Sequence, residues 1–192
     1  MRVLVVDDEE LVVHLLRRYL QKWGHEAVCA TDGSEAWEQF QKEPVPMVIT
    51  DWMMPRMTGL DLIRKIRAHA QGGSVYAVVL TGRAAKEDVV TGMEAGADDF
   101  LAKPFDKDEL RVRVREGERI VELERARADA EARCTALRQH VARGTESVEQ
   151  DLARAIGLLG KLNGSAPAEC AEALAQLTNA REGLAALGRA AT

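Results

Sequence analysis

The chain has 192 residues, enough for one full domain with an accessory segment. Its formal net charge is −5 at pH 7, which gives no electrostatic reason to expect nucleic-acid binding. No apolar run approaches the roughly 18 residues that cross a bilayer, and the N-terminus enters an expected strand without a secretory signal. Three widely spaced cysteines suggest reduced thiols, so we expect a cytoplasmic protein that binds neither nucleic acid nor a membrane.

Short apolar runs and helical patterns alternate along the first half of the chain. Each run ends at a turn or a polar residue, as a buried strand does, and between the runs apolar residues recur at helical spacing. We expect strands at about 2–6, 25–30, 45–50, 75–80 and 98–102, and helices at about 11–23, 34–40, 60–70 and 86–95. Ser34 is the expected cap of the second helix. This alternation predicts an α/β fold, a doubly wound parallel sheet covered on both faces.

Polar residues follow the expected strands, at the ends that face one crevice in a parallel sheet. They are Asp7 and Asp8 after the first strand, Asp51 after the third, Thr81 after the fourth and Lys103 after the fifth. Carboxylates that converge repel one another unless a divalent cation neutralises them, and an all-oxygen site suits Mg²⁺. A lysine and a hydroxyl suit the oxygens of a phosphoryl group. Taken alone, Asp51 has a second interpretation, as the cap of the following helix.

In order and spacing, these residues resemble the receiver domain of two-component response regulators, which has a CheY-like, flavodoxin-like fold. Further matching positions are Met54-Pro55 and Gly59 after the acceptor, Phe100, and Pro104 after the lysine. The resemblance implies a receiver domain over residues 1–120. It also implies a histidine kinase or phosphotransfer protein as the partner that donates the phosphoryl group.

The resemblance assigns the phosphoacceptor and the metal ligands. Asp51 accepts the phosphoryl group. Asp8, Asp51 and the backbone carbonyl of Met53 bind Mg²⁺, and Asp7 acts mainly through water. Protein-side work in phosphoryl transfer is mostly positioning and charge neutralisation, which such a set supplies.

The resemblance also implies a switch. Lys103 pairs with the phosphoryl group, Thr81 moves to bond one of its oxygens, and Phe100 turns inward. Met53 and Arg83, each two residues past a site residue, flank the path of the hydrolytic water in this family. A bulky apolar group and a long cation there would slow loss of the phosphoryl group, unless they are simple surface variation.

The sequence changes character at Asp106, the expected cap of the last receiver helix. Beyond it there are one proline and no aromatic residue, with abundant Ala, Glu, Arg and Leu, a composition typical of helices. A seam with alternating steps of three and four, and one extra four-residue step, predicts a coiled coil over residues 121–192. Its positions are Ile120, Leu123, Arg127, Ala130, Cys134, Leu137 and Val141, then Thr145, Val148, Leu152, Ala155, Leu159 and Leu162.

This tail is expected to turn back on itself. The long helix should break near Gly144 and stop at 163–167, and a final helix should run from about 168 to 190. Two striped helices joined by a short turn predict a helical hairpin that becomes a four-helix bundle in a parallel homodimer. The alternative is a monomeric extension that folds back on the receiver.

Two kinds of function remain open. The chain is either a phosphorylation-controlled interaction module that dimerises through its tail, or the regulatory fragment of a longer output enzyme or of a phosphorelay protein with a kinase-like hairpin. His140 precedes Val141 rather than the acid usual in kinase phosphoacceptor motifs, so we expect a solvated helix residue. No Walker loop, zinc spacing or nucleophile triad indicates a separate output enzyme.

Overall fold

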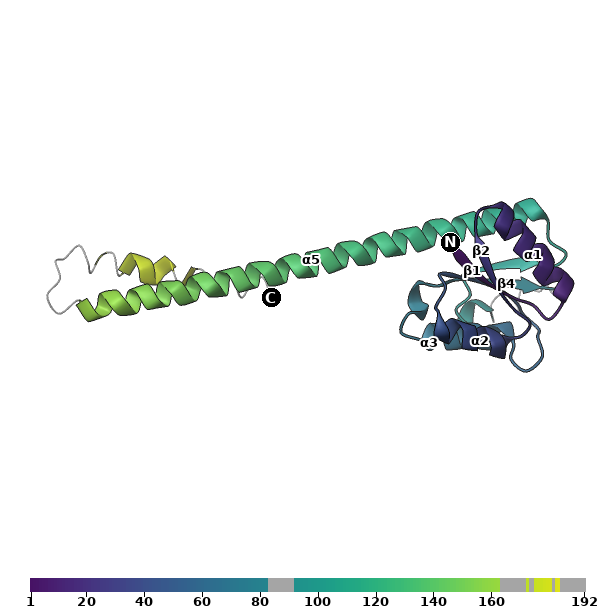
Figure 1. Ribbon diagram of the computed structural model, residues 1–192, viewed down its shortest axis with the longest axis horizontal. Helices are drawn as coiled ribbons and strands as arrows, with labels where there is room; N and C mark the ends of the chain where they lie inside the picture. Colours follow the sequence, from purple (N-terminus) through teal and green to yellow (C-terminus); the bar gives the residue numbers. More distant parts are fainter. Residues whose placement is uncertain (83–91, 163–171, 173–174, 181, 184–192) are drawn as a thin grey trace. The chain divides into compact units, whose positions relative to one another are not determined.

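The computed structural model describes residues 1–82, 92–162, 172, 175–180 and 182–183 (Figure 1). The chain divides into two compact units, Met1–Ala126 and Arg127–Thr192. The first unit runs to Ala126 and includes Val121, which is part of its core and only 3% exposed, while the receiver boundary at residue 120 remains a prediction.

The first unit is built on a parallel five-stranded sheet with the order β2-β1-β3-β4-β5. The strands are β1 (Arg2–Val6), β2 (Glu26–Ala30), β3 (Met47–Asp51), β4 (Tyr76–Thr81) and β5 (Asp99–Ala102). Each expected strand is present, with bounds that differ from the expected ones by at most two residues. Because every strand runs the same way, their carboxyl ends share one edge of the sheet.

Helices cover both faces of this sheet (Figure 1). On one face, α1 (Glu10–Lys22) and the first turns of α5 pack on residues such as Val5, Ile49 and Val78. On the other, α2 (Gly33–Lys42) and α3 (Gly59–Ala68) pack on the alternate residues of the strands. A short 3-10 helix, η1 (Gly72–Ser74), precedes β4. The alternation along each strand thus fills two apolar layers, which is the doubly wound arrangement.

Two local predictions need correction or lie outside the described residues. Asp32, not Ser34, caps α2, since its side chain accepts hydrogen bonds from the backbone N–H groups of Ser34 and Glu35. Of the expected helix at 86–95, residues 86–91 lie outside the described residues, and residues 92–94 are helical.

The last helix of the receiver continues as α5 (Lys107–Leu162), 56 residues long. The predicted break at Gly144 is wrong. One glycine in a helix costs only about 1 kcal/mol relative to alanine, which neighbouring contacts can offset. On either side of Gly144, the Arg143 side chain donates a hydrogen bond to the Gln139 carbonyl and the Thr145 hydroxyl donates one to the Ala142 carbonyl.

The described part of α5 runs to Leu162, so the predicted stop at 163–167 remains a prediction. The turn at 163–167 and most of the final helix at 168–190 lie outside the described residues. Within that span, residues 172, 175–180 and 182–183 are helical.

Candidate functional site

Polar residues from four strands meet at the carboxyl edge of the sheet, as predicted. Asp51 is the last residue of β3 and Thr81 the last of β4, while Asp7 and Lys103 directly follow β1 and β5. Asp7 is buried next to Lys103, and Asp51, Thr81 and Lys103 line a cavity of about 440 Å³. Its lining residues are Glu9, Asp51, Trp52, Met53, Thr81, Gly82 and Lys103.

Lys103 holds two of the carboxylates together. Its Nζ lies 2.5 Å from Asp51 Oδ1 and 2.7 Å from Asp7 Oδ2, with Glu9 Oε1 further away at 3.8 Å. Asp7 is fully buried and Asp51 is 7% exposed. The ammonium therefore neutralises acids that would otherwise repel one another in a poorly solvated place.

Burial and charge act in opposite directions on these groups. Burial raises the pKa of Asp7, and it outweighs the hydrogen bonds from Lys103 and from the Glu9 backbone, which lower it. Burial also favours a lower pKa for Lys103, but its hydrogen bonds to Asp51 and Asp7 outweigh this and raise the pKa. Lys103 therefore stays a cation at neutral pH.

The backbone after Asp51 folds back onto its carboxylate. The Met53 N–H donates to Asp51 Oδ2 at 2.7 Å, and the Gly59 N–H closes the loop on the Trp52 carbonyl at 3.0 Å. A Cβ on Gly59 would collide with the Asp51 carbonyl oxygen, so this turn requires glycine. The Met53 side chain is 69% exposed at the rim of the cavity.

The oxygen donors at this edge fit Mg²⁺ in kind. Asp7 and Asp51 converge, Asp8 is exposed beside them, and the loop with the Met53 carbonyl is fastened to Asp51. Three carboxylates beside one lysine leave an excess of negative charge, which a hard divalent cation balances. Within the described residues, no three His, Cys, Asp or Glu side chains are grouped closely enough to hold a metal ion by themselves, and Lys103 bridges Asp7 and Asp51.

Two predicted switch residues lie near the cavity. Thr81 lines it and is 6% exposed. Phe100 on β5 is half-buried, with its ring 6.5 Å from that of Trp52 and in close contact with Gly92. Sequence reasoning missed Trp52, although an aromatic residue directly after the strand-end acid is a visible signal.

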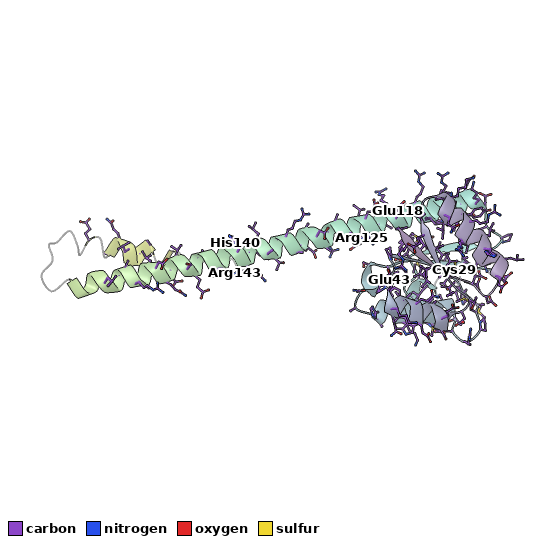
Figure 2. The ribbon with its side chains drawn as sticks, in the orientation of Figure 1. Cys29, Glu43, Glu118, Arg125, His140 and Arg143 are labelled. Carbon is purple, nitrogen blue, oxygen red and sulfur yellow. The ribbon has the colours of Figure 1, made fainter. Side chains whose placement is uncertain are left out.

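Two further residues, Arg83 and His140, carry predictions from the sequence. Arg83, predicted to flank the hydrolytic water, lies outside the described residues, so its role remains a prediction. His140 lies on the exposed surface of α5 (Figure 2), as expected for a solvated residue.

Comparison with known proteins decides the family. The family model of the response regulator receiver domain matches residues 3–115. The chain belongs to the response regulator receiver family. Receiver domains work in two-component systems, where they interact with histidine kinases or phosphotransfer proteins. The predicted family and the parallel α/β fold are thereby confirmed.

Individual relatives match the same part of the chain. Response regulator MprA from Mycobacterium leprae is 41% identical over 115 residues, 60% of this chain and 50% of MprA, so the chain spans about half the length of that relative. A chemotaxis protein CheY homolog from Campylobacter jejuni is 35% identical over 116 residues, 59% of this chain and 89% of the homolog.

A solved structure extends the comparison to the metal. The receiver domain of sensor histidine kinase PA1611 from Pseudomonas aeruginosa has a magnesium ion coordinated in its active-site cleft. It matches with a TM-score of 0.57 at 27% identity, over 63% of this chain and 97% of that one.

In the part of our chain that the structure describes, no helix is apolar and long enough to span a membrane.

Proposed function

We propose that this receiver accepts a phosphoryl group on Asp51 from a phosphohistidine of a histidine kinase or phosphotransfer protein. The observation that carries the proposal is the placement of Asp51. Its carboxylate ends a central strand at a cavity, with one oxygen on the Lys103 ammonium and the other on the Met53 N–H. Such a group is fixed in orientation and open to a reactant on one side.

In the transfer, a carboxylate oxygen of Asp51 attacks phosphorus in line with the scissile P–N bond. That bond breaks, and its electron pair leaves with the imidazole of the donor. Lys103, already a cation beside Asp51, moves its donors to the incoming phosphoryl oxygens. Bound Mg²⁺ would neutralise the charge of these oxygens. Asp8, Asp51 and the Met53 carbonyl would hold the ion, and Asp7 would act mainly through water.

The switch uses residues that lie beside the acceptor. Thr81 moves to bond a phosphoryl oxygen, and Phe100, which now lies beside Trp52 and Gly92, turns inward. Phe100 belongs to β5, the strand that leads through Lys103 into α5. Phosphorylation thus biases a two-state element at the root of the long helix.

Phosphorylation by acetyl phosphate tests this directly. With Mg²⁺, the full chain should gain one phosphoryl group by intact-mass measurement, and Asp51→Asn should gain none. Lys103→Ala should still bind Mg²⁺ but lose the conformational response. Incorporation that persists in Asp51→Asn, or without a divalent metal, would contradict the assignment.

We propose further that the tail, residues 121–192, makes a parallel homodimer and serves as the output of the receiver. Its seam carries exposed apolar residues, including Leu123 at 59%, Leu137 at 65% and Val148 at 50%. Burying each such leucine is worth roughly 1.5–3 kcal/mol, so a second copy of the same stripe is a favourable cover.

Cys134 offers a test of the parallel arrangement. It is a free, exposed thiol at a seam position. In a parallel, in-register pair the two Cys134 side chains face each other, so a mild oxidant such as diamide should link the chains quickly through this residue. Cys134→Ser should abolish the link while Cys29→Ser keeps it. A dimer in solution that forms no Cys134 link would contradict the parallel register.

A further inference from the structure

An ion pair beyond the cavity lining ties the β3–α3 loop to the start of α2. Arg56 lies in this loop, and its Nη2 donates to Asp32 Oδ2. The arginine side chain is 67% exposed, whereas that of Asp32 is only 2% exposed. A carboxylate this deeply buried is costly to leave without a partner, so this pair differs from an ordinary surface salt bridge.

Asp32 is itself held rigidly. Its Oδ1 accepts the backbone N–H groups of Ser34 at 2.7 Å and Glu35 at 3.0 Å, which caps α2. One oxygen of Asp32 therefore fixes the helix end and the other receives Arg56. The guanidinium is anchored to a secondary-structure element and not to another mobile side chain.

The backbone of the loop needs such an anchor. Arg56 has a φ of 67°, the one positive φ among the described residues other than glycine. This left-handed conformation is unfavourable for a residue with a Cβ, so contacts elsewhere in the structure must stabilise the backbone at Arg56. The next residue supplies one: a Cβ on Gly33 would lie 2.7 Å from the Met57 carbonyl oxygen and 2.9 Å from its Cβ, so loop and helix end touch at two successive positions.

The same loop carries the contact that orients the acceptor. Met53 donates its N–H to Asp51 at one end of the loop, and Gly59 closes the other end on Trp52. Arg56 lies between these two closures. Without its anchor, the strained middle of the loop would relax and take the Met53 backbone with it.

We infer that Arg56 and Asp32 form a latch that holds the β3–α3 loop in the conformation in which Met53 meets Asp51. Arg56 is then a positioning residue for metal binding and phosphoryl transfer at Asp51. The inference rests on the proposed function for its consequence, but the latch itself is a property of the metal-free chain.

The test uses the full chain and two readouts. Calorimetric titration with Mg²⁺ alone should give a dissociation constant roughly tenfold weaker in Arg56→Ala, the low end of what lost orienting contacts cost a metal site. Hydrogen–deuterium exchange without metal should show faster exchange confined to residues 52–58. The matched control is Arg64→Ala, because Arg64 pairs with Asp61 at 2.9 Å with both partners about half exposed, and it should behave as the parent chain.

A second variant separates the ion pair from the backbone strain. Arg56→Gly adopts the positive φ freely and also removes the guanidinium. The latch predicts weaker Mg²⁺ binding and faster loop exchange here too. Parent-like binding and exchange in both variants would overturn the inference. If the parent chain itself bound no Mg²⁺, the proposed function would fail, and loop exchange in the metal-free variants would still decide for or against the latch.

Discussion

The receiver unit and the continuation of α5 beyond it differ in where their apolar side chains lie. In the receiver, Leu16, Leu20 and Ile66 are fully buried in clusters between the sheet and its helices. On α5, Leu137 and Leu158 are each 65% exposed. Apolar residues at helical spacing are thus buried within the receiver unit, whereas residues of the same type on α5 are exposed.

This difference separates what each region needs in order to be stable. The receiver closes its core with its own chain, so its fold and its site belong to one copy. The exposed apolar seam positions of α5, such as Leu137 and Val148, are called the stripe below. They have the spacing of a coiled-coil seam, and such a seam is buried only against another helix. We therefore expect substitutions in the receiver to change stability and chemistry, and substitutions on the stripe to change association.

The largest expected effect comes from breaking the stripe. Leu137→Gln combined with Val148→Gln keeps good helix formers but removes four apolar side chains from a dimer. At roughly 1.5–3 kcal/mol per buried leucine, the dimer dissociation constant should rise at least about 100-fold. Analytical ultracentrifugation measures it, with Gln139→Ala and Gln150→Ala on the opposite face as the control pair. Unchanged association would mean that the stripe is not the interface.

The next effect sharpens the receiver side of the contrast. Leu20 is fully buried and Leu11 is 83% exposed, on the same helix α1. Leu20→Ala should lower the free energy of unfolding by about 2–5 kcal/mol through lost burial and a cavity, whereas Leu11→Ala should change it by less than about 0.5 kcal/mol. Urea denaturation compares the two. Equal losses would show that the pattern of burial on α1 is different.

The smallest effect concerns His25, which is 8% exposed between the N-terminal amine at 3.4 Å and Glu118 Oε1 on α5 at 3.9 Å. Burial lowers its pKa, and attraction to Glu118 only partly opposes this. The unfolded state therefore takes up a proton first as the pH falls below about 6.5, and stability declines through that window.

His25→Gln should remove this part of the acid sensitivity. The measurement is the melting temperature between pH 7 and pH 5. His14→Gln, on the exposed surface of α1, serves as the control and should keep the parent slope. A slope in His25→Gln as steep as in the parent would assign the sensitivity to other groups.

Much of the receiver could be predicted from its sequence, for a physical reason. Parallel strands bring their carboxyl ends to one edge, so residues such as Asp51, Thr81 and Lys103 had to meet once the strands were recognised. The sequence did not predict the ion pairs of Lys103 with Asp7 and Asp51, because these residues are far apart in the chain and only the folded structure brings them into contact. The metal and switch roles of these residues remain predictions.

What the sequence did not predict depends on tertiary contacts or on competing local signals. Asp32 and Ser34 are both good helix caps, and spacing alone does not choose between them. The pairing of Arg56 with Asp32 and its positive φ arise from the fold of the loop and carry no local pattern. Helical periodicity likewise marks an apolar face without saying what covers it, which is why the sequence places Leu137 in a seam although its side chain is exposed.

The central proposal is that the tail, and not the receiver, brings two copies together. Sedimentation equilibrium on the full chain and on residues 1–126, a boundary that keeps the buried Val121, compares the two directly. At tens of micromolar, we expect a dimer for the full chain and a monomer for the receiver unit alone. A monomeric full chain, or a dimer equally tight without the tail, would contradict it.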